Sequence, residues 1–166
     1  MGKVVSQDEL ILHRSEWKRN GKRVVLASGS FDLLHPGHVR LLEQARGLGD
    51  VLVVGVESDA AVRAKSGGTA APNSNLARPI TPAGERMEIL AALAAVDCVV
   101  EFGAPTTRDL LARLRPDVVV EGGGEMDSAF TDRSEAHATE SRVVHIPLEP
   151  GFSTSRLIDR IKQLTA

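Results

Sequence analysis

Hydrophobic residues along the chain gather in short runs that alternate with amphipathic segments. Five largely apolar runs predict strands at residues 24–27, 51–56, 97–102, 117–121 and 142–146. Apolar residues at helical spacing predict helices at residues 6–20, 39–45, 82–94, 106–114 and 153–164. Strands that alternate with helices pair in parallel through right-handed crossovers, and strands that are apolar throughout are typical of a sheet covered on both faces. The pattern therefore predicts an α/β fold, a Rossmann-like doubly wound parallel sheet of about five strands.

Local signals indicate where two of the helices begin. Ser6 and Glu9 have the spacing of a capping box, and the helix that follows is expected to pack its apolar side on the body of the protein. At the 82–94 helix, Thr81 is the expected N-cap and Pro82 the expected first helical residue.

Length and composition limit the classes of function. A chain of 166 residues fits one domain, which we divide into an N-terminal helical extension at 1–21 and a core at 22–164. The formal net charge of −2 gives no electrostatic footprint for nucleic acid or an anionic membrane, so any phosphate binding must be local. The single cysteine, Cys98, excludes an intramolecular disulfide and a cysteine-based zinc site, and it is expected to be a buried small hydrophobe. No apolar run is long enough to span a bilayer, so a cytoplasmic protein is the expectation.

The turn after the first predicted strand carries the clearest chemical signal. It reads Ser-Gly-Ser-Phe-Asp-Leu-Leu-His-Pro-Gly-His over residues 28–38, between a buried strand and a helix. Pro36 suits the first turn of that helix, and His35 and His38, three residues apart, can project from one face of it. Ligands collect at the carboxyl ends of parallel strands, and two imidazoles beside a helix N-terminus can donate hydrogen bonds to phosphate oxygens. The alternative is a helix cap and a surface residue.

Three further segments carry residues that suit anion binding. Arg63 and Lys65 follow the second strand, Gly122 and Gly123 follow the fourth, and Ser153, Thr154 and Ser155 open the last helix. A lysine there can neutralise triphosphate charge, glycines can admit a nucleotide base or ribose, and hydroxyls with free N–H groups can form a second anion site. The alternatives are a solvated surface pair, a flexible turn and an ordinary helix cap. Residues 66–78 are rich in turn formers and favour a lid or binding loop, with disorder as the alternative.

The histidine turn is similar to a known sequence signature. Residues 29–38 resemble the G-[ST]-F-D-x-x-H-x-G-H motif of the cytidylyltransferase-like nucleotidyltransferases. Residues 57–59, 78–86 and 151–155 resemble that superfamily's N-S-D, R-P-x-x-P-x-x-x-R and G-x-S-T-[ST] segments, and residues 95–97 also fit. The resemblance covers residues 22–164 and implies the H-x-G-H nucleotidyltransferase fold.

One branch of the superfamily is most similar. The 78–86 segment and the glycine turn at 121–124 look most like the D-glycero-β-D-manno-heptose 1-phosphate adenylyltransferases, which make ADP-heptose for lipopolysaccharide and related surface sugars. That branch often forms one half of a bifunctional kinase–transferase. This sequence carries no kinase half, so a stand-alone transferase is the expectation. The sequence departs from the branch at Glu121, where lysine is usual, at Gly124-Glu125-Met126, where G-D-Y is usual, and in a longer 66–77 loop. These departures affect the identification of the sugar substrate and of the nucleotide base, and they leave the prediction of nucleotidyl transfer unchanged.

The resemblance implies in-line attack by a sugar phosphate oxygen on the α-phosphorus of ATP, with release of pyrophosphate. By this resemblance, His35 and His38 contact the α- and β-phosphate oxygens of ATP, and Lys65 neutralises the charge that develops at the reacting phosphates. Ser153 and Thr154 bind the β- and γ-phosphates. Ser30, Phe31, Asp32, Arg86, Gly122, Gly123 and Ser155 complete the expected nucleotide site, with Asp32 orienting the motif rather than acting as a base. Mg²⁺ is expected with the triphosphate, although no metal-ligand cluster in the sequence points to it. The expected partners are the small molecules ATP and sugar phosphate, and a homodimer, common among relatives, is compatible with the resemblance.

Two other functions stay open. A cytidylyltransferase acting on glycerol 3-phosphate or a similar small phosphorylated alcohol would share every phosphate contact, and a preference for CTP would distinguish it. A non-catalytic nucleotide-binding module would bind ATP without releasing pyrophosphate. The presence of both histidines, Lys65 and the terminal hydroxyl cluster argues against the second alternative.

Overall fold

The computed structural model describes residues 1–65, 77–103, 106–122, 140–147 and 150–164. Within these residues, six parallel strands form one sheet in the order β1-β4-β3-β2-β5-β6. The strands are β1 (Lys3–Val4), β2 (Val24–Gly29), β3 (Val51–Glu57), β4 (Cys98–Phe102), β5 (Val118–Gly122) and β6 (Arg142–Ile146). The last five match the predicted strands, so the parallel α/β sheet is confirmed.

The helices lie between the strands and after them. They are α1 (Gln7–Arg19), α2 (Pro36–Arg46), α3 (Asp59–Lys65), α4 (Ala83–Ala91), α5 (Thr106–Leu114) and α7 (Thr154–Leu164). The predicted capping box of α1 is confirmed, because Ser6 Oγ accepts from the Glu9 N–H and the Glu9 carboxylate accepts from the Ser6 N–H. The predicted start of α4 is wrong by one residue: Pro82 is the N-cap, without a side-chain cap, and Ala83 is the first helical residue.

The sequence analysis does not predict β1 and α3. Strand β1 comprises two exposed residues that pair with β4 at the edge of the sheet, and two residues are too few for a periodic signal. The predicted sheet of about five strands is therefore corrected to six. Helix α3 has seven residues, of which Val62 is buried, so it also lacks a repeating apolar face.

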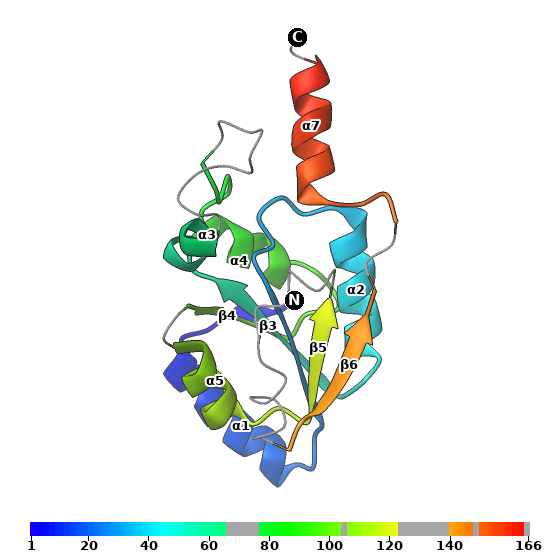
Figure 1. Cartoon of the computed structure of the whole chain (residues 1–166). Coiled ribbons are helices and arrows are strands. Elements are labelled where there is room, and N and C mark those ends of the chain that lie inside the picture. The colour runs from blue at the N-terminus through cyan, green and yellow to red at the C-terminus, as the bar shows by residue number, and fades with distance from the viewer. Residues whose placement is uncertain (66–76, 104–105, 123–139, 148–149, 165–166) are drawn as a thin grey trace.

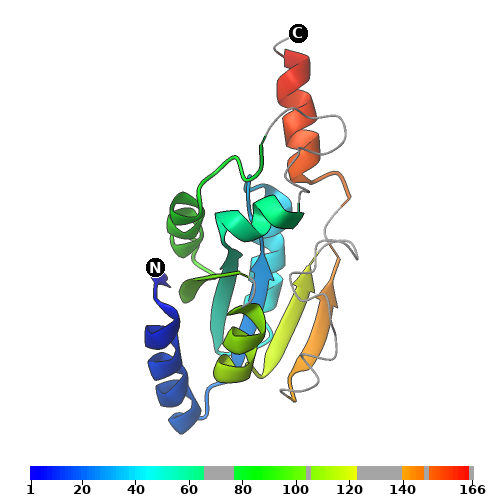
Figure 2. The ribbon, with the colours of Figure 1, turned by 60° about the vertical axis from the view of Figure 1, so that its left-hand side comes forward.

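Side chains of β2 alternate between two hydrophobic cores, one on each face of the sheet. Val25 and Ala27 pack in a core that includes residues of α2 and α4. Val24 and Leu26 pack in a second core, which includes residues of α1 and α5. Figure 2 shows the resulting layers, with helices on both faces of the sheet. All four side chains are at most 1% exposed, which confirms the doubly wound arrangement.

The order of the strands reverses beside β2. Strands β2, β3 and β4 follow one another in one direction, whereas β5 and β6 lie on the other side of β2. In open parallel sheets such a switch point opens a crevice at the carboxyl ends of the strands, where ligands bind. The turn that contains His35 and His38 leaves β2 at this edge, which is the upper edge of the sheet in Figure 1.

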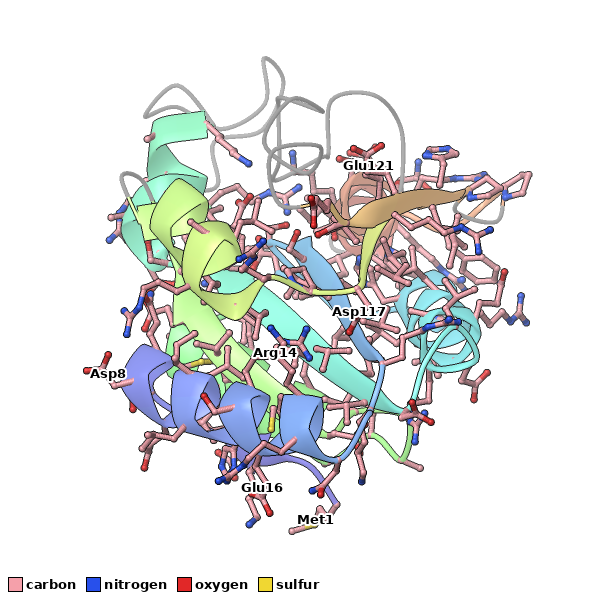
Figure 3. All side chains as sticks on the ribbon, turned by 90° about the horizontal axis from the view of Figure 1, so that it is seen from below. Met1, Asp8, Arg14, Glu16, Asp117 and Glu121 are labelled. Carbon is pink, nitrogen blue, oxygen red and sulfur yellow. The ribbon has the colours of Figure 1, made fainter. Side chains whose placement is uncertain are left out.

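Three aspartates hold the opposite, amino-terminal edge of the sheet. Asp50, Asp97 and Asp117 each directly precede a strand, and each accepts a hydrogen bond of 2.7–2.8 Å from a backbone N–H at the start of the neighbouring strand. Arg14 of α1 adds an ion pair to Asp117 at 3.4 Å, and Figure 3 shows both side chains at this lower edge. These carboxylates fix how β2 to β5 are aligned.

The last helix stands away from the sheet. In Figures 1 and 2, α7 projects beyond the carboxyl edge, with the end of the chain at its far end. Helical spacing predicts that Leu157, Ile158, Ile161 and Leu164 all face the core. Ile158 is buried and Leu157 is half-buried, but Ile161 and Leu164 are exposed. The prediction is therefore wrong for Ile161 and Leu164, because α7 leaves the body of the protein. Within the described residues, no helix is both long enough and apolar enough to cross a membrane.

Candidate active site

The two histidines of the β2–α2 turn lie against each other at the start of α2. His35 is the N-cap residue, in an extended conformation, and Pro36 is the first helical residue. His38 follows in the first turn, and its N–H donates to the His35 carbonyl at 2.9 Å. The two imidazole rings are stacked, with centroids 3.7 Å apart and 16° between the ring planes. The structure thus brings both predicted residues together at a helix N-terminus.

Both rings carry a buried polar atom without a partner. The Nδ1 atoms of His35 and His38 have no hydrogen-bond partner among the described residues. Burial lowers the pKa of His35, and burial together with the neighbouring His35 ring lowers the pKa of His38 to about 4. Both imidazoles are therefore neutral near pH 7, and each has one N–H to donate. Buried polar atoms without partners are costly, so a pair of them marks a place where a polar ligand can bind.

The depressed pKa of His38 makes stability depend on pH. An unfolded histidine takes up a proton near pH 6.5, whereas in the folded protein His38 stays neutral down to about pH 4. Between these values the unfolded state binds more protons, so the free energy of unfolding falls as the pH falls. We expect this group to contribute a loss of about 2 kcal/mol between pH 7 and pH 5, measured by urea unfolding at each pH. The variant His38→Gln should lose this part of the dependence, and an unchanged slope in it would contradict the assignment.

Phe31 is held in a left-handed backbone conformation, with φ of +48°. Residues with a side chain seldom adopt this region, and holding one there costs about 1–3 kcal/mol. The buried ring meets His38 edge-on, with centroids 5.3 Å apart and 64° between the planes. The strained residue thus places an aromatic ring beside the histidine pair. Its contact with a nucleotide stays a prediction.

Asp32 holds the segment that leads into α4. Its buried carboxylate accepts from Arg78 Nη1 at 2.9 Å and from the backbone N–H groups of Ile80 at 2.7 Å and Thr81 at 2.9 Å. A carboxylate that already accepts from three protein donors, one of them a guanidinium, is held in place and is occupied as a hydrogen-bond acceptor. These contacts favour an orienting role for Asp32.

Arg86 is 1% exposed and joins the ends of two strands. Its guanidinium donates to the carbonyl oxygens of Ser30 at 2.5 Å, Glu57 at 2.9 Å and Thr81 at 2.8 Å, and to the Asp59 carboxylate at 2.6 Å. Ser30 directly follows β2 and Glu57 ends β3, so the guanidinium ties both strand ends to the start of α4. The sequence predicts nucleotide contacts for Arg86 and Ser30, whereas the structure shows them bound to each other. These contacts favour a positioning role, and a contact of either residue with nucleotide stays a prediction.

Lys65 lies at the end of α3, and its ammonium group is paired with the carboxylate of Glu57. The Glu57 side chain is 5% exposed, and the Lys65 side chain is 47% exposed. The dependence is one-sided: without Lys65 the buried Glu57 carboxylate would lose its ion-pair partner, whereas without Glu57 the half-exposed ammonium group of Lys65 would still be hydrated. The predicted contact of Lys65 with a triphosphate would therefore require Lys65 to exchange partners.

Gly122 ends β5 and lies against α2. A Cβ at this position would come within 2.1 Å of Leu41 Cδ1, so glycine lets the helix and the strand pack closely. This packing is a structural reason for Gly122 beside the predicted nucleotide contact. Gly123 and the Gly124-Glu125-Met126 departure lie outside the described residues, as does most of the 66–78 loop.

The three hydroxyl residues before and within α7 have different surroundings. Ser153 Oγ accepts from the Arg156 N–H at 3.2 Å and caps the helix. Thr154 Oγ1 donates to the carbonyl of Leu33 at 3.4 Å, which links α7 to the histidine turn. Ser155 is exposed. Capping explains one of the three hydroxyls, as the sequence suggests, and their binding of phosphate stays a prediction.

Comparison with known proteins places this geometry in a family. The sequence profile described as cytidylyltransferase-like matches residues 26–160, from β2 into α7. The chain belongs to the cytidylyltransferase-like family. Membership confirms the resemblance drawn from the histidine turn, and it makes the protein a nucleotidyltransferase.

Several curated proteins are similar over nearly the whole chain. The bifunctional protein HldE of Koribacter versatilis (strain Ellin345) is 44% identical over 158 residues, which are 95% of this chain and 31% of the relative. The bifunctional protein HldE of Rhodopseudomonas palustris (strain BisB5) is 40% identical over 162 residues, 98% of this chain and 31% of the relative. The chain therefore spans about a third of the length of these curated relatives.

Two solved structures share the fold. The lipopolysaccharide core biosynthesis protein from Thermoplasma volcanium GSS1 superposes with a TM-score of 0.60 and 25% identity, covering 78% of this chain and 98% of that protein. A pantoate-beta-alanine ligase from Francisella tularensis superposes with a TM-score of 0.57 and 12% identity, covering 100% of this chain and 79% of that protein. The second likeness shows the fold alone.

Sequence reasoning assigned no role to three residues of this cytidylyltransferase-like site. Glu57 and Asp59 stand in a segment matched to the family, and the structure shows that they bind Lys65 and Arg86. Phe152 stands beside the hydroxyl residues, and its ring lies near His35. The signal for Glu57 and Asp59 was their place directly at the carboxyl end of a strand. Phe152 carried no comparable signal, because its partners lie far away along the chain.

Proposed function

We propose that this chain transfers the adenylyl group of ATP to D-glycero-β-D-manno-heptose 1-phosphate, giving ADP-heptose and pyrophosphate. The observation that carries the proposal is the stacked pair of His35 and His38, whose buried Nδ1 atoms lack described partners at the N-terminus of α2. A helix N-terminus attracts anions, and a switch point such as that between β2 and β5 is where open parallel sheets bind ligands. The relatives named HldE and the likeness of residues 78–86 to the heptose branch support the choice of sugar and base.

The proposed reaction needs no proton acceptor. The attacking oxygen of the sugar phosphate is already ionised near neutral pH, and it forms a bond to the α-phosphorus of ATP. The bond from that phosphorus to the bridging oxygen breaks, and pyrophosphate leaves with the electron pair. Preorganised hydrogen-bond donors accelerate such a transfer by stabilising charge on the phosphate oxygens. We assign that role to the imidazoles of His35 and His38.

Two further groups would hold the leaving phosphates. Lys65 would exchange the Glu57 carboxylate for the triphosphate as the nucleotide binds. Ser153 and Thr154 would present hydroxyl groups and the free N–H groups of the start of α7. Support for this part comes from the Thr154 hydrogen bond to Leu33, which links the start of α7 to the histidine turn.

Mg²⁺ would arrive with the triphosphate. Among the described residues, no group of three or more His, Cys, Asp or Glu side chains is placed to hold a metal ion. Mg²⁺ prefers oxygen ligands and is commonly held by substrate phosphates with one or two carboxylates, so a dedicated protein cage is not required. When bound, it would neutralise charge on the phosphates.

Pyrophosphate release tests the proposed function. The purified chain is assayed with Mg²⁺ and ATP, CTP or GTP, each against heptose 1-phosphate and glycerol 3-phosphate. We expect release with ATP and heptose 1-phosphate alone. Release with CTP and glycerol 3-phosphate would instead assign the chain to the cytidylyltransferases of small phosphorylated alcohols. Binding of ATP with no release from any pair would identify a non-catalytic nucleotide-binding module.

A further inference from the structure

The ring of Phe152, just before α7, lies against the start of α2. Its centroid is 6.3 Å from that of His35, with 24° between the ring planes. The guanidinium carbon of Arg40, on α2, lies over the Phe152 ring at 5.4 Å from its centroid. Phe152 is therefore a neighbour of the histidine pair, although the two segments lie far apart along the chain.

Gly37 makes this close approach possible. A Cβ at position 37 would lie 3.0 Å from Phe152 Cβ and 3.1 Å from His35 Nδ1. Separations this short are rare between packed atoms, so the absence of a side chain leaves the space in which Phe152 and His35 meet. Thr154 adds a second link nearby, because its hydroxyl donates to the carbonyl of Leu33. The start of α7 is thus fastened to the histidine turn at two points.

Phe152 extends a series of aromatic rings. The rings of Phe152, His35, His38 and Phe31 follow one another with centroid separations of 6.3, 3.7 and 5.3 Å. His35 is 5% exposed, so this side chain is enclosed by its neighbours rather than by water. A catalytic side chain gains precision when the packing around it leaves few orientations open. The orientation of the His35 ring determines where its N–H points.

We propose that Phe152 is a positioning residue, which holds the His35 ring in the orientation that meets a phosphate of the nucleotide. The inference rests on the proposed function, because it takes His35 to contact the nucleotide. Phe152 acts through His35 and does not touch the reacting atoms. The same contact fixes the start of α7, with its hydroxyl groups, relative to the histidine pair.

Three variants distinguish the effect of the Phe152 ring from the effect of the Arg40 guanidinium that lies over it. Phe152→Ala removes the ring, Phe152→Leu keeps an apolar side chain in its place, and Arg40→Met removes the cation but keeps the ring. Pyrophosphate release gives kcat and the KM for ATP. NMR titration of the imidazole protons of the ligand-free protein gives the pKa of His35.

We expect Phe152→Ala to lower kcat about 10- to 100-fold, with a smaller change in KM, because a misplaced donor weakens the transition state. In this variant water reaches the His35 ring, so the depressed pKa of His35 should rise toward its ordinary value. Phe152→Leu should recover most of the loss, and Arg40→Met should stay within about threefold of the wild-type kcat.

An unchanged kcat and an unchanged His35 titration in Phe152→Ala would overturn the proposal. Equal losses in Phe152→Ala and Arg40→Met would also overturn it, since they would assign the effect to the cation. If Phe152→Ala does not fold, Phe152→Val replaces it, because it also removes the ring from beside His35 and should give the same two changes in smaller size. The titration needs no substrate, so it tests the contact between Phe152 and His35 separately from the reaction. If the pKa of His35 rises in Phe152→Ala but the wild-type protein releases no pyrophosphate, the proposed function is refuted and the contact is supported.

Discussion

Replacement of His38 by alanine is expected to lower the turnover of adenylyl transfer by on the order of 10²–10³ and to leave the fold intact. The reason is that, in the proposed mechanism, the variant loses one preorganised donor at the N-terminus of α2, where charge would develop on the α-phosphate. The Nδ1 atom of His38 has no hydrogen-bond partner among the described residues, so the substitution removes no hydrogen bond at that atom. The measurement is pyrophosphate release with saturating ATP and heptose 1-phosphate, with circular dichroism to follow the fold.

His13→Ala is the matched control for that variant. His13 lies on α1 and stacks on Trp17, with centroids 5.7 Å apart, and α1 lies away from the carboxyl edge of the sheet in Figure 1. Its loss should leave kcat within about twofold, as expected of a substitution outside the site. Near wild-type turnover in His38→Ala would remove His38 from the proposed mechanism.

The second large effect concerns stability. Arg86→Met should lower the free energy of unfolding by about 3–5 kcal/mol, the cost of breaking a buried charged network on one side. The substitution removes the guanidinium donor from the carbonyl oxygens of Ser30, Glu57 and Thr81 and from the carboxylate of Asp59, which keeps the Ala83 N–H as a donor. Urea unfolding at pH 7, followed by circular dichroism, gives the difference.

Arg63→Met provides the comparison, because Arg63 is an exposed arginine of α3 and should cost no more than about 0.5 kcal/mol. If Arg86→Met unfolds at the same urea concentration as the wild type, Arg86 does not hold the strand ends together. If it also loses turnover while keeping full stability, the direct phosphate contact predicted from the sequence would be the better assignment.

Much of the fold could be predicted from the sequence, because it follows from patterns local to each segment. The runs at residues 117–121 and 142–146 each contain three apolar residues within a short segment, and they form β5 and β6. Strand β1 could not be found, since its two residues are exposed and gain their structure only by pairing with β4. For the same reason helical spacing misled at Ile161 and Leu164: the pattern shows that a face is apolar, not that anything covers it.

The same distinction between local and long-range contacts separates the site residues that could be predicted from those that could not. His35 and His38 belong to one turn, so their spacing and the helix that follows predicted that they lie together. The surroundings of Arg86 could not be predicted, because its partners come from three segments that only the folded chain brings together. Phe152 was missed for this reason as well, since it contacts His35 from a segment that lies near the other end of the sequence.

Asp50, Asp97 and Asp117 align the strands from the edge of the sheet that is remote from His35. A slip of one residue would turn every side chain of a strand to the opposite face, so this alignment protects both cores at once. At the other edge, Arg86 and Asp32 add their own contacts between the strand ends and the start of α4. Turns from a relative with another substrate can therefore be transplanted onto this scaffold one at a time, provided that the chimera keeps the three aspartates and the contacts of Arg86 and Asp32.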